Sequence, residues 1–320
     1  MGKYILRRLL VAIPILFGIT LIDFTFINLA PGDPIMAMVS AEAGSAQGAV
    51  DAERLRQNLG LDKPIAVRYV TWLTEILQGN FGVSFSSKRP VLERINERLG
   101  PTLLLTGSAM LISLLVGIPL GCIAALKQYS KLDYALTVVA FAGISVPNFF
   151  LAMAAISLFT LQLRLLPAFG MATVGEPFSL LDRLRYLIMP AFILGLANMA
   201  AIMRYGRISL LEVLSQDYIT TARAKGLGEW IVVARHAFRN ALLPLITILA
   251  LRLPGLFSGS VIIETIYSWP GIGQLSIEAI NQRDYPQIMG LLLVTAVLVL
   301  VANLLADIAY AYADPRVRYE

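Results

Sequence analysis

The chain has 320 residues, of which 57% are apolar and 15% are charged, and its formal net charge is +5. A soluble domain is usually roughly 45–50% apolar and about 25% charged, so this composition excludes an ordinary soluble fold. The single cysteine, Cys122, excludes an intrachain disulfide, and with only one histidine the chain cannot build a Cys/His metal cage.

Apolar residues gather in runs of about 20, the length that crosses the hydrocarbon core of a bilayer as a helix. Unbroken apolar runs also exclude a membrane β-barrel, which alternates apolar and polar residues. We therefore predict an all-α polytopic membrane protein with six transmembrane helices. The predicted spans are residues 9–30, 102–126, 134–161, 187–205, 241–264 and 288–310.

The first span follows a basic tail, Met1 to Arg8, as a signal peptide would. Its apolar run is longer than a signal core of roughly 7–15 residues, and no small-x-small cleavage site follows it. We therefore expect an uncleaved first helix.

The short connections between the spans differ in charge. The N-terminal tail, the second-to-third and fourth-to-fifth connections and the C-terminal tail together hold 13 Lys and Arg residues, whereas the opposite short connections hold 4. Because basic residues are retained on the cytoplasmic side, we expect both termini to lie there.

The long first connection, residues 31–100, is predicted to be an external helical subdomain. Three short helices are predicted in it, and their limiting residues are Asp51 and Gly60, Pro64 and Gly79, and Pro90 and Gly100. The apolar face of the second is expected to hold Tyr69, Trp72, Leu73, Ile76 and Leu77. This subdomain is either a docking surface for an external partner or a cap on the helix bundle.

The segment from Leu210 to Pro244 is long, charged and helix-forming. One helical stripe is predicted from a four-residue recurrence, which consists of Leu214, Tyr218, Ala222 and Gly226. The stripe narrows to small residues, so another protein could approach its backbone closely. Gly226 and Gly228 predict a turn, and a second helix should follow it.

This segment resembles a known family. The stretch Asp217-Tyr-Ile-Thr-Thr-Ala-Arg-Ala-Lys-Gly226, followed by Arg239-Asn-Ala-Leu-Leu-Pro244, is similar to the coupling loop of ABC importer permeases. That loop is written Glu-Ala-Ala-x3-Gly-x9-Ile-x-Leu-Pro. The matching residues are Ala222, Gly226, Leu243 and Pro244. The departures are Thr220 and Thr221 for Glu and the first Ala, Ala241 for Ile, and a longer spacing after the glycine.

Other stretches resemble landmarks of the dipeptide, oligopeptide and nickel branch of this family, in order along almost the whole chain. They are Arg7-Arg-Leu-Leu, Pro31-Gly-Asp-Pro34, Leu59-Gly-Leu-Asp-Lys-Pro64, Ser145-Val-Pro-Asn-Phe149, Leu166-Pro-Ala-Phe-Gly170, Glu264-Thr-Ile-Tyr-Ser-Trp-Pro-Gly-Ile-Gly273, Arg283-Asp-Tyr-Pro286 and Asp314-Pro-Arg316.

The resemblance implies a type I ABC importer permease fold in a bacterial inner membrane. It implies four kinds of partner: a second homologous permease about a pseudo-twofold axis, two cytoplasmic ATP-binding subunits, an external solute-binding protein and the lipid bilayer. ATP and Mg would be bound by the ATPase subunits, since this chain has no Gly-x4-Gly-Lys-[Ser/Thr] loop. The chain itself would be no enzyme and would hold no catalytic, cofactor or metal site. Nucleic acid is not an expected partner.

The implied contacts with the ATPase lie in the coupling loop, with Ala222 and Gly226 on the face pressed against it. The expected residues are Tyr218, Thr221, Ala222, Arg223, Lys225, Gly226 and Leu227. The expected division of the chain is a tail and first helix at 1–30, the external subdomain at 31–100, a five-helix permease core at 101–311 with the coupling loop at about 210–240, and a cytoplasmic tail at 312–320.

Polar groups at membrane depth are candidates for the translocation path, because burying a charge in lipid is costly. They are Asp23, Asn148, Arg252 and Glu264. Arg252 precedes Pro254-Gly255, which should break the fifth helix; it either meets a solute carboxylate or pairs with Asp23 or with the partner permease. Glu264 either faces the path or extends to the membrane interface.

Pro147-Asn148 should kink the third span. Gly117-x3-Gly121 and Gly255-x3-Gly259 would allow neighbouring helices to approach closely.

The predicted function is import of di- or oligopeptides by alternating access. A nickel or chelated-metal importer of the same branch is the first alternative, and a stand-alone secondary carrier is the second. A membrane enzyme is disfavoured because the lone histidine, His236, lies among basic residues of the cytoplasmic loop and no His-Glu-x2-His or Gly-x-Ser-x-Gly motif is present.

Overall fold

The computed structural model describes residues 2–29 and 62–313. The predicted helix between Asp51 and Gly60 and the stretches at 31–34 and 314–316 lie outside these ranges. The chain forms two compact units, each described separately below. Unit 1 comprises residues 1–100 and 271–301, and unit 2 comprises residues 101–270 and 302–320.

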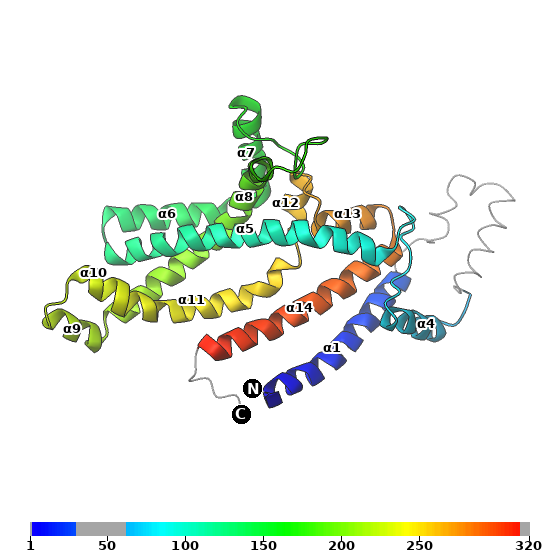
Figure 1. The fold of residues 1–320 in the computed structure, drawn as a ribbon, viewed down its shortest axis with the longest axis horizontal. Helices are drawn as coiled ribbons and strands as arrows, with labels where there is room; N and C mark the ends of the chain where they lie inside the picture. Colours follow the sequence, from blue (N-terminus) through cyan, green and yellow to red (C-terminus); the bar gives the residue numbers. More distant parts are fainter. Residues whose placement is uncertain (1, 30–61, 314–320) are drawn as a thin grey trace. The chain divides into compact units, whose positions relative to one another are not determined.

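The described chain is mostly helical (Figure 1). Its α-helices are α1 Gly2–Leu29, α4 Ile65–Leu77, α5 Val91–Leu126, α6 Lys131–Ser145, α7 Asn148–Ala155, α8 Leu180–Leu214, α9 Asp217–Ala224, α10 Glu229–Ile231, α11 Phe238–Arg252, α12 Val261–Ile266, α13 Ile272–Asn281 and α14 Tyr285–Ala313. Two π-helical turns, η1 Ile156–Gln162 and η2 Val232–Ala237, and a 3₁₀ turn, η3 Leu253–Leu256, complete the set.

Within the described residues, four of the six predicted apolar runs fall on one α-helix each. The run at 134–161 is divided among α6, α7 and η1, and the run at 241–264 among α11, η3 and α12. Among the described residues, α1, α5, α8 and α14 are long and apolar enough to cross a membrane. Two further helix pairs pass the same test only when each is taken together, Lys131–Gly143 with Asn148–Gln162 and Glu229–Leu242 with Pro244–Leu256. They are bent by 97° and 41°, so the described chain holds four to six candidate spans. The kink predicted at Pro147 is confirmed, because the 97° bend lies there.

Helix α5 runs through the position where the sequence predicted a stop. Gly100 and Pro101 lie inside this 36-residue helix, so the expected short helix ending at Gly100 is wrong. Apolar burial on both sides, at Ile95 in unit 1 and Leu105 in unit 2, outweighs a glycine cost of about 1 kcal/mol. The carbonyl of Pro101 accepts a hydrogen bond from the buried Trp269 indole at 2.9 Å.

In unit 2, α5 and α8 approach closely through small residues. A β-carbon on Gly117 would lie 2.8 Å from the Met199 carbonyl oxygen, and one on Gly121 would lie 2.5 Å from that of Met203. This confirms the close approach predicted for the first glycine pair. Gly255, in contrast, has open space where a side chain would lie, so the second pair does not bring helices together there.

In unit 1, α4 packs on α1 through aromatic residues. The Tyr69 and Trp72 rings lie 5.3 and 5.7 Å from the Phe24 ring, and the Tyr69 hydroxyl is 2.9 Å from Thr20 Oγ1. The helix predicted between Pro64 and Gly79 is therefore confirmed. Leu77 does not share its buried face, since it is 78% exposed.

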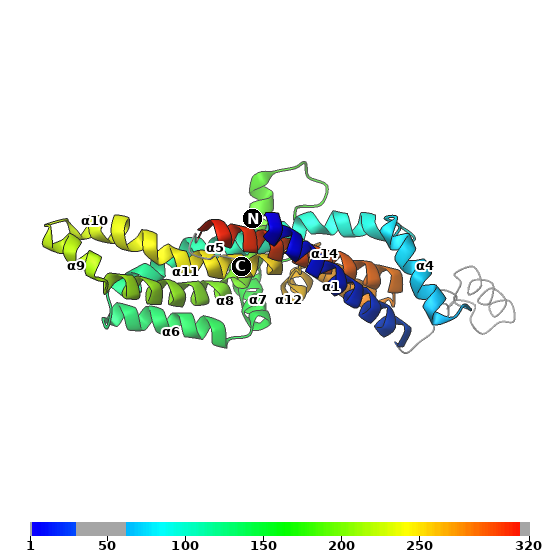
Figure 2. The ribbon, with the colours of Figure 1, turned by 90° about the horizontal axis from the view of Figure 1, so that it is seen from below.

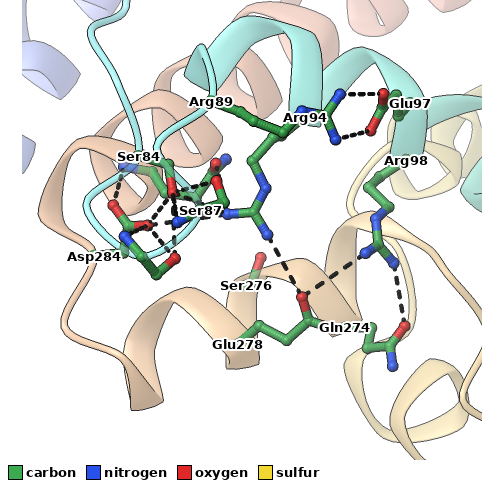
Figure 3. Close-up of polar contacts among 12 residues, drawn as sticks. Ser84, Ser87, Arg89, Arg94, Glu97, Arg98, Gln274, Ser276, Glu278 and Asp284 are labelled. Atoms are coloured by element: carbon green, nitrogen blue, oxygen red, sulfur yellow. Dashed lines mark hydrogen bonds and ion pairs between the residues drawn. The ribbon is translucent and has the colours of Figure 1, made fainter.

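A polar cluster in unit 1 holds two connections together (Figure 3). The Asp284 carboxylate, just before α14, accepts hydrogen bonds from Ser84 Oγ at 2.5 Å, Phe85 N at 2.9 Å and Ser86 Oγ at 2.8 Å. Arg94 lies beside it, with its guanidinium 3.9 Å from Asp284 and 3.8 Å from Glu278. The Arg283-Asp-Tyr-Pro286 stretch therefore serves to anchor the connection that precedes α5.

Candidate coupling segment and solute path

The coupling segment (residues 210–244) forms a helical hairpin between α8 and α11 in unit 2. Figures 1 and 2 both show α9 and α10 grouped at the end of α8 and the start of the chain leading to α11. Helix α8 ends at Leu214 and α9 begins at Asp217. The stripe predicted from Leu214 to Gly226 is therefore not one continuous helix.

Gly226 ends α9 in a geometry that favours glycine. Its φ is +75°, its N–H donates to the Arg223 carbonyl at 2.9 Å, and the Leu227 N–H donates to the Ala222 carbonyl at 3.4 Å. These two bonds form a Schellman motif with glycine in the left-handed region. A β-carbon at Gly226 would meet nothing within 4 Å, so the constraint lies in the backbone angle.

Ala222 points into the coupling segment itself. It is 8% exposed and packs in a core with Leu210, Ile219, Val232 and Ala237. The expectation that Ala222 lies on an outward face beside Gly226 is therefore wrong. A small residue suits this position because α8, α9 and η2 all contribute buried side chains to the same core.

The outward surface of the segment is formed by other residues. Tyr218 is 43% exposed, Leu227 38%, Trp230 80% and Ile231 45%. Trp230 was missed as a site residue, although a tryptophan following a Gly-x-Gly turn in a charged loop is a visible signal.

Two polar contacts brace this surface. Arg223 forms an ion pair with Glu229 at 2.6 Å across the Gly226 turn. Asn240 Nδ2 donates to the Tyr218 hydroxyl at 2.9 Å. Lys225 is the exposed C-cap of α9, and the Thr221 hydroxyl donates to the Asp217 carbonyl at 3.0 Å.

Arg252 lies at the last residue of α11, where the predicted helix break occurs. Its guanidinium donates a hydrogen bond to Asn198 Oδ1 of α8. Both residues line a cavity of about 350 Å³ together with Thr106, Gly255 and Gly259. This volume lies within the range of roughly 300–1,000 Å³ for small-ligand sites. Asn198 was not among the predicted site residues.

The other candidate path residues do not line this cavity. Glu264 is fully buried, and its carboxylate accepts hydrogen bonds from Thr102 Oγ1 and Ser260 N, each at 3.2 Å. The expected position at the membrane interface is therefore wrong, because these bonds hold the side chain inside unit 2. Asn148 is the first residue of α7 at the 97° bend. Asp23 is 8% exposed in unit 1, and its pairing with Arg252 of unit 2 remains one of the alternatives drawn from the sequence.

Comparison with known proteins identifies the family. The model described as "Binding-protein-dependent transport system inner membrane component" matches residues 117–319, and the model of the N-terminal part of such membrane components matches residues 1–106. The oligopeptide transport system permease protein AppB of Bacillus subtilis is 44% identical over 320 residues, which is 100% of both chains. The dipeptide transport system permease protein DppB of Escherichia coli K12 is 38% identical over 341 residues, again 100% of both chains.

Solved structures agree on the fold. A chain of the MetNI methionine ABC transporter, in a structure described as inward facing, superposes with a TM-score of 0.55 at 16% identity. The match covers 70% of this chain and 97% of that one. The chain belongs to the family of inner membrane components of binding-protein-dependent transport systems.

Proposed function

We propose that this chain is the channel-forming permease subunit of an ATP-driven importer of di- or oligopeptides. The observation that carries the proposal is the end-to-end similarity to AppB and DppB, whose names specify oligopeptide and dipeptide transport. This similarity favours peptides over nickel, the alternative solute of the same branch. The coupling segment favours an ATPase-driven importer over a stand-alone carrier, which needs no such cytoplasmic hairpin.

The proposed topology has six spans with both termini in the cytoplasm. It takes each bent pair as one span, and the 13-to-4 distribution of basic residues supports its orientation. The proposed functional parts are the first helix at 1–30, an external subdomain at 31–100, the permease core at 101–311 and a cytoplasmic tail at 312–320.

The proposed ATPase contact is the outward face of the coupling segment. Trp230, Leu227 and Tyr218 supply apolar area, while Lys225 and Arg223 add positive charge. Buried aromatic anchors commonly carry most of the energy of an interface. Ala222 lies buried beneath this face, and the exposed Thr221 and Gly226 help to keep its backbone shape.

The proposed solute path includes the cavity at Arg252 and Asn198. A guanidinium can bind a peptide carboxylate through paired hydrogen bonds. The broken end of α11 supports this role, since irregular backbone at membrane depth occurs where it lines a cavity or is buried in protein. Asn148, Asp23 and Glu264 remain proposals for the same path at other conformational stages.

Alternating access requires partners on both sides of the membrane. The proposed complex contains a second homologous permease, two cytoplasmic ATPase subunits that bind ATP and Mg, and an external solute-binding protein. ATP binding would close the ATPase pair, and the coupling segments would transmit that closure to the permeases. Such coupling needs two global states that are biased from separate sites.

The test is uptake by the complete reconstituted transporter. The purified complex is placed in vesicles with ATP inside and loaded binding protein outside, and uptake of a radiolabelled dipeptide is compared with that of ⁶³Ni²⁺. We expect ATP-dependent accumulation of the dipeptide. Uptake of nickel without uptake of the dipeptide would show that the transporter imports nickel, the alternative solute, and not peptides. ATP-independent uptake by this chain without the ATPase subunits would overturn the importer assignment.

A further inference from the structure

A second cavity lies between α6 and α8 in unit 2, apart from the cavity at Arg252. Its volume is about 280 Å³. Its walls include Thr137, Ala140 and Phe141 of α6, and Ala200, Met203 and Arg204 of α8. Neither the coupling segment nor the proposed solute path uses it.

The cavity is charged at one end and apolar at the other. Asp133 at the start of α6 pairs with Arg207 of α8, so these two residues lie level. Figure 1 shows that α6 and α8 run in opposite directions. Ala200 lies about 10 Å further along α8, on the side where Ala140 and Phe141 form the α6 wall. This polarity matches that of a lipid, with its head beside the arginines and its chain between the helices.

The two arginines at the charged end differ in their partners. Arg207 forms two hydrogen bonds with the Asp133 carboxylate, at 2.8 and 2.7 Å, so its charge is balanced within the chain. Arg204 forms no hydrogen bond or ion pair with any residue in the described part of the chain; its guanidinium lies 5.4 Å from the centre of the Tyr205 ring. One cation at the rim is thus available to an anion from outside.

The surroundings of this rim indicate which anion. Under the proposed topology, Lys131 at the start of α6 and Arg204 lie at the cytoplasmic membrane surface, where anionic lipids attract basic residues. Tyr134, Val138 and Phe141 of α6 are 60%, 66% and 54% exposed, as expected of a helix that faces lipid or another membrane helix.

We propose that this cavity binds an anionic phospholipid of the cytoplasmic leaflet. The lipid phosphate pairs with the Arg204 guanidinium, and the first part of one acyl chain lies against Ala140, Phe141 and Ala200. A lipid seated there contacts both α6 and α8, and α8 leads directly into the coupling segment. The transporter therefore binds anionic lipid at a defined site in this chain, in addition to the general attraction of its basic residues to an anionic membrane surface.

The test measures lipid retained by the intact transporter. The complete complex is reconstituted in vesicles of phosphatidylcholine with an equal amount of phosphatidylglycerol, extracted in mild detergent and examined by native mass spectrometry. We expect retained phosphatidylglycerol, with retention reduced about fivefold by Arg204→Gln, the effect of removing one Arg contact with anionic lipid. Ala140→Phe, which fills the apolar end without changing charge, should reduce it similarly.

Lys131→Gln is the matched control. This change also removes one positive charge from the proposed cytoplasmic surface, but Lys131 does not line the cavity. Retention of phosphatidylglycerol should therefore stay at the wild-type level. The same spectra report subunit stoichiometry and so show whether each variant assembles. Unchanged retention in both assembled cavity variants would overturn the proposal. Equal retention of phosphatidylcholine, or an equal loss in Lys131→Gln, would also overturn it by showing unselective or general surface binding.

Discussion

The Tyr218 hydroxyl accepts a hydrogen bond from Asn240 at 2.9 Å, although the two residues are 22 positions apart. This bond joins α9 to the beginning of α11, on the two arms of the coupling segment. Asn240 also donates to the His236 carbonyl at 3.0 Å, so its amide bridges η2, α11 and α9. These bonds give α9 a direct contact with the helix that ends at Arg252.

Tyr218→Phe removes the acceptor of this bond and keeps the ring. We expect binding-protein-stimulated ATP hydrolysis to fall a few-fold, because a hydrogen bond of about 1 kcal/mol no longer joins the two arms. The measurement is ATPase activity of the reconstituted complex with and without loaded binding protein. Tyr134→Phe is the control, since Tyr134 is exposed on α6. An equal effect of both changes would contradict a specific role of the Tyr218–Asn240 bond.

Substitutions at Gly226 test whether coupling depends on the backbone conformation of the turn or on contact between a small residue and the ATPase. Leucine in the left-handed region costs about 1–2 kcal/mol, whereas asparagine tolerates it better. We therefore expect Gly226→Leu to lose most ATPase stimulation and Gly226→Asn to retain most of it. Gly228→Ala is the control, since Gly228 has an ordinary φ of −62°. Normal stimulation in Gly226→Leu would show that the turn is dispensable for coupling.

Trp230 tests the proposed ATPase contact. Removing an aromatic anchor from an interface costs about 2 kcal/mol or more, which is roughly 30-fold in affinity. We expect Trp230→Ala to weaken association with the ATPase subunits by that order, measured by titrating purified ATPase onto the permease pair in nanodiscs. Leu77→Ala removes a similarly exposed apolar side chain from α4 and should leave the affinity unchanged. Retained affinity in Trp230→Ala would place the contact elsewhere.

Arg252 can pair with Asp23 or remain available for solute, and a double-mutant cycle distinguishes the two. If the residues pair, Arg252→Ala and Asp23→Ala each lower the unfolding temperature, and the double variant is no less stable than either. We expect the other outcome: additive losses, with uptake reduced mainly by Arg252→Ala, because Arg252 lines the cavity with Asn198. A coupling energy above about 0.5 kcal/mol would establish the pair.

Ionisation of Asp284 should make the stability of unit 1 depend on pH in the acid range. Burial opposes ionisation of its carboxyl, but the hydrogen bonds from Ser84, the Phe85 N–H and Ser86 outweigh burial and hold its pKa below the usual value. Because the pKa of Asp284 is lower in the folded state, its ionised carboxylate stabilises the fold at pH values above the pKa of an unfolded-state aspartate, about 3.9. This contribution is lost as the pH falls through the folded-state pKa.

We therefore expect the unfolding temperature of the wild-type complex to fall as the pH drops below about 4. Asp284→Asn should be less stable near neutral pH and should lose part of this acid dependence. The measurement is a thermal-unfolding series in detergent, with Asp62→Asn at an exposed position as the control. Identical acid profiles for Asp284→Asn and the wild type would contradict the role of this carboxylate.

The positions of the helices could be predicted from the sequence, because apolar run length and the prolines at 147 and 254 act locally. The break between α8 and α9 could not, since the four-residue spacing of Leu214, Tyr218 and Ala222 continues across Ser215 and Gln216. The continuity of α5 at Gly100 depends on burial that the surrounding helices supply, which local sequence does not contain.

In the candidate site, too, local features could be predicted from the sequence, whereas contacts between helices could not. The turn predicted at Gly226 and Gly228 is confirmed, and Gly226 has a φ of +75° in it. The burial of Ala222, the exposure of Trp230 and the contact between Arg252 and Asn198, 54 positions apart, depend on which helices meet. Spacing along one segment carries no information about such encounters.

The ion pair between Asp133 and Arg207 has a mechanical consequence for unit 2. It fixes the start of α6 to α8, and the glycine contacts at Gly117 and Gly121 fix α8 to α5. Three helices joined in this way resist bending where they meet and behave as a stiff frame. Rotation of that frame would be taken up where the backbone is already irregular: at the bend before Asn148, at the bend between Leu242 and Pro244, and in the non-α-helical turn after Arg252. These joints, rather than the long helices, would set how far the permease can open.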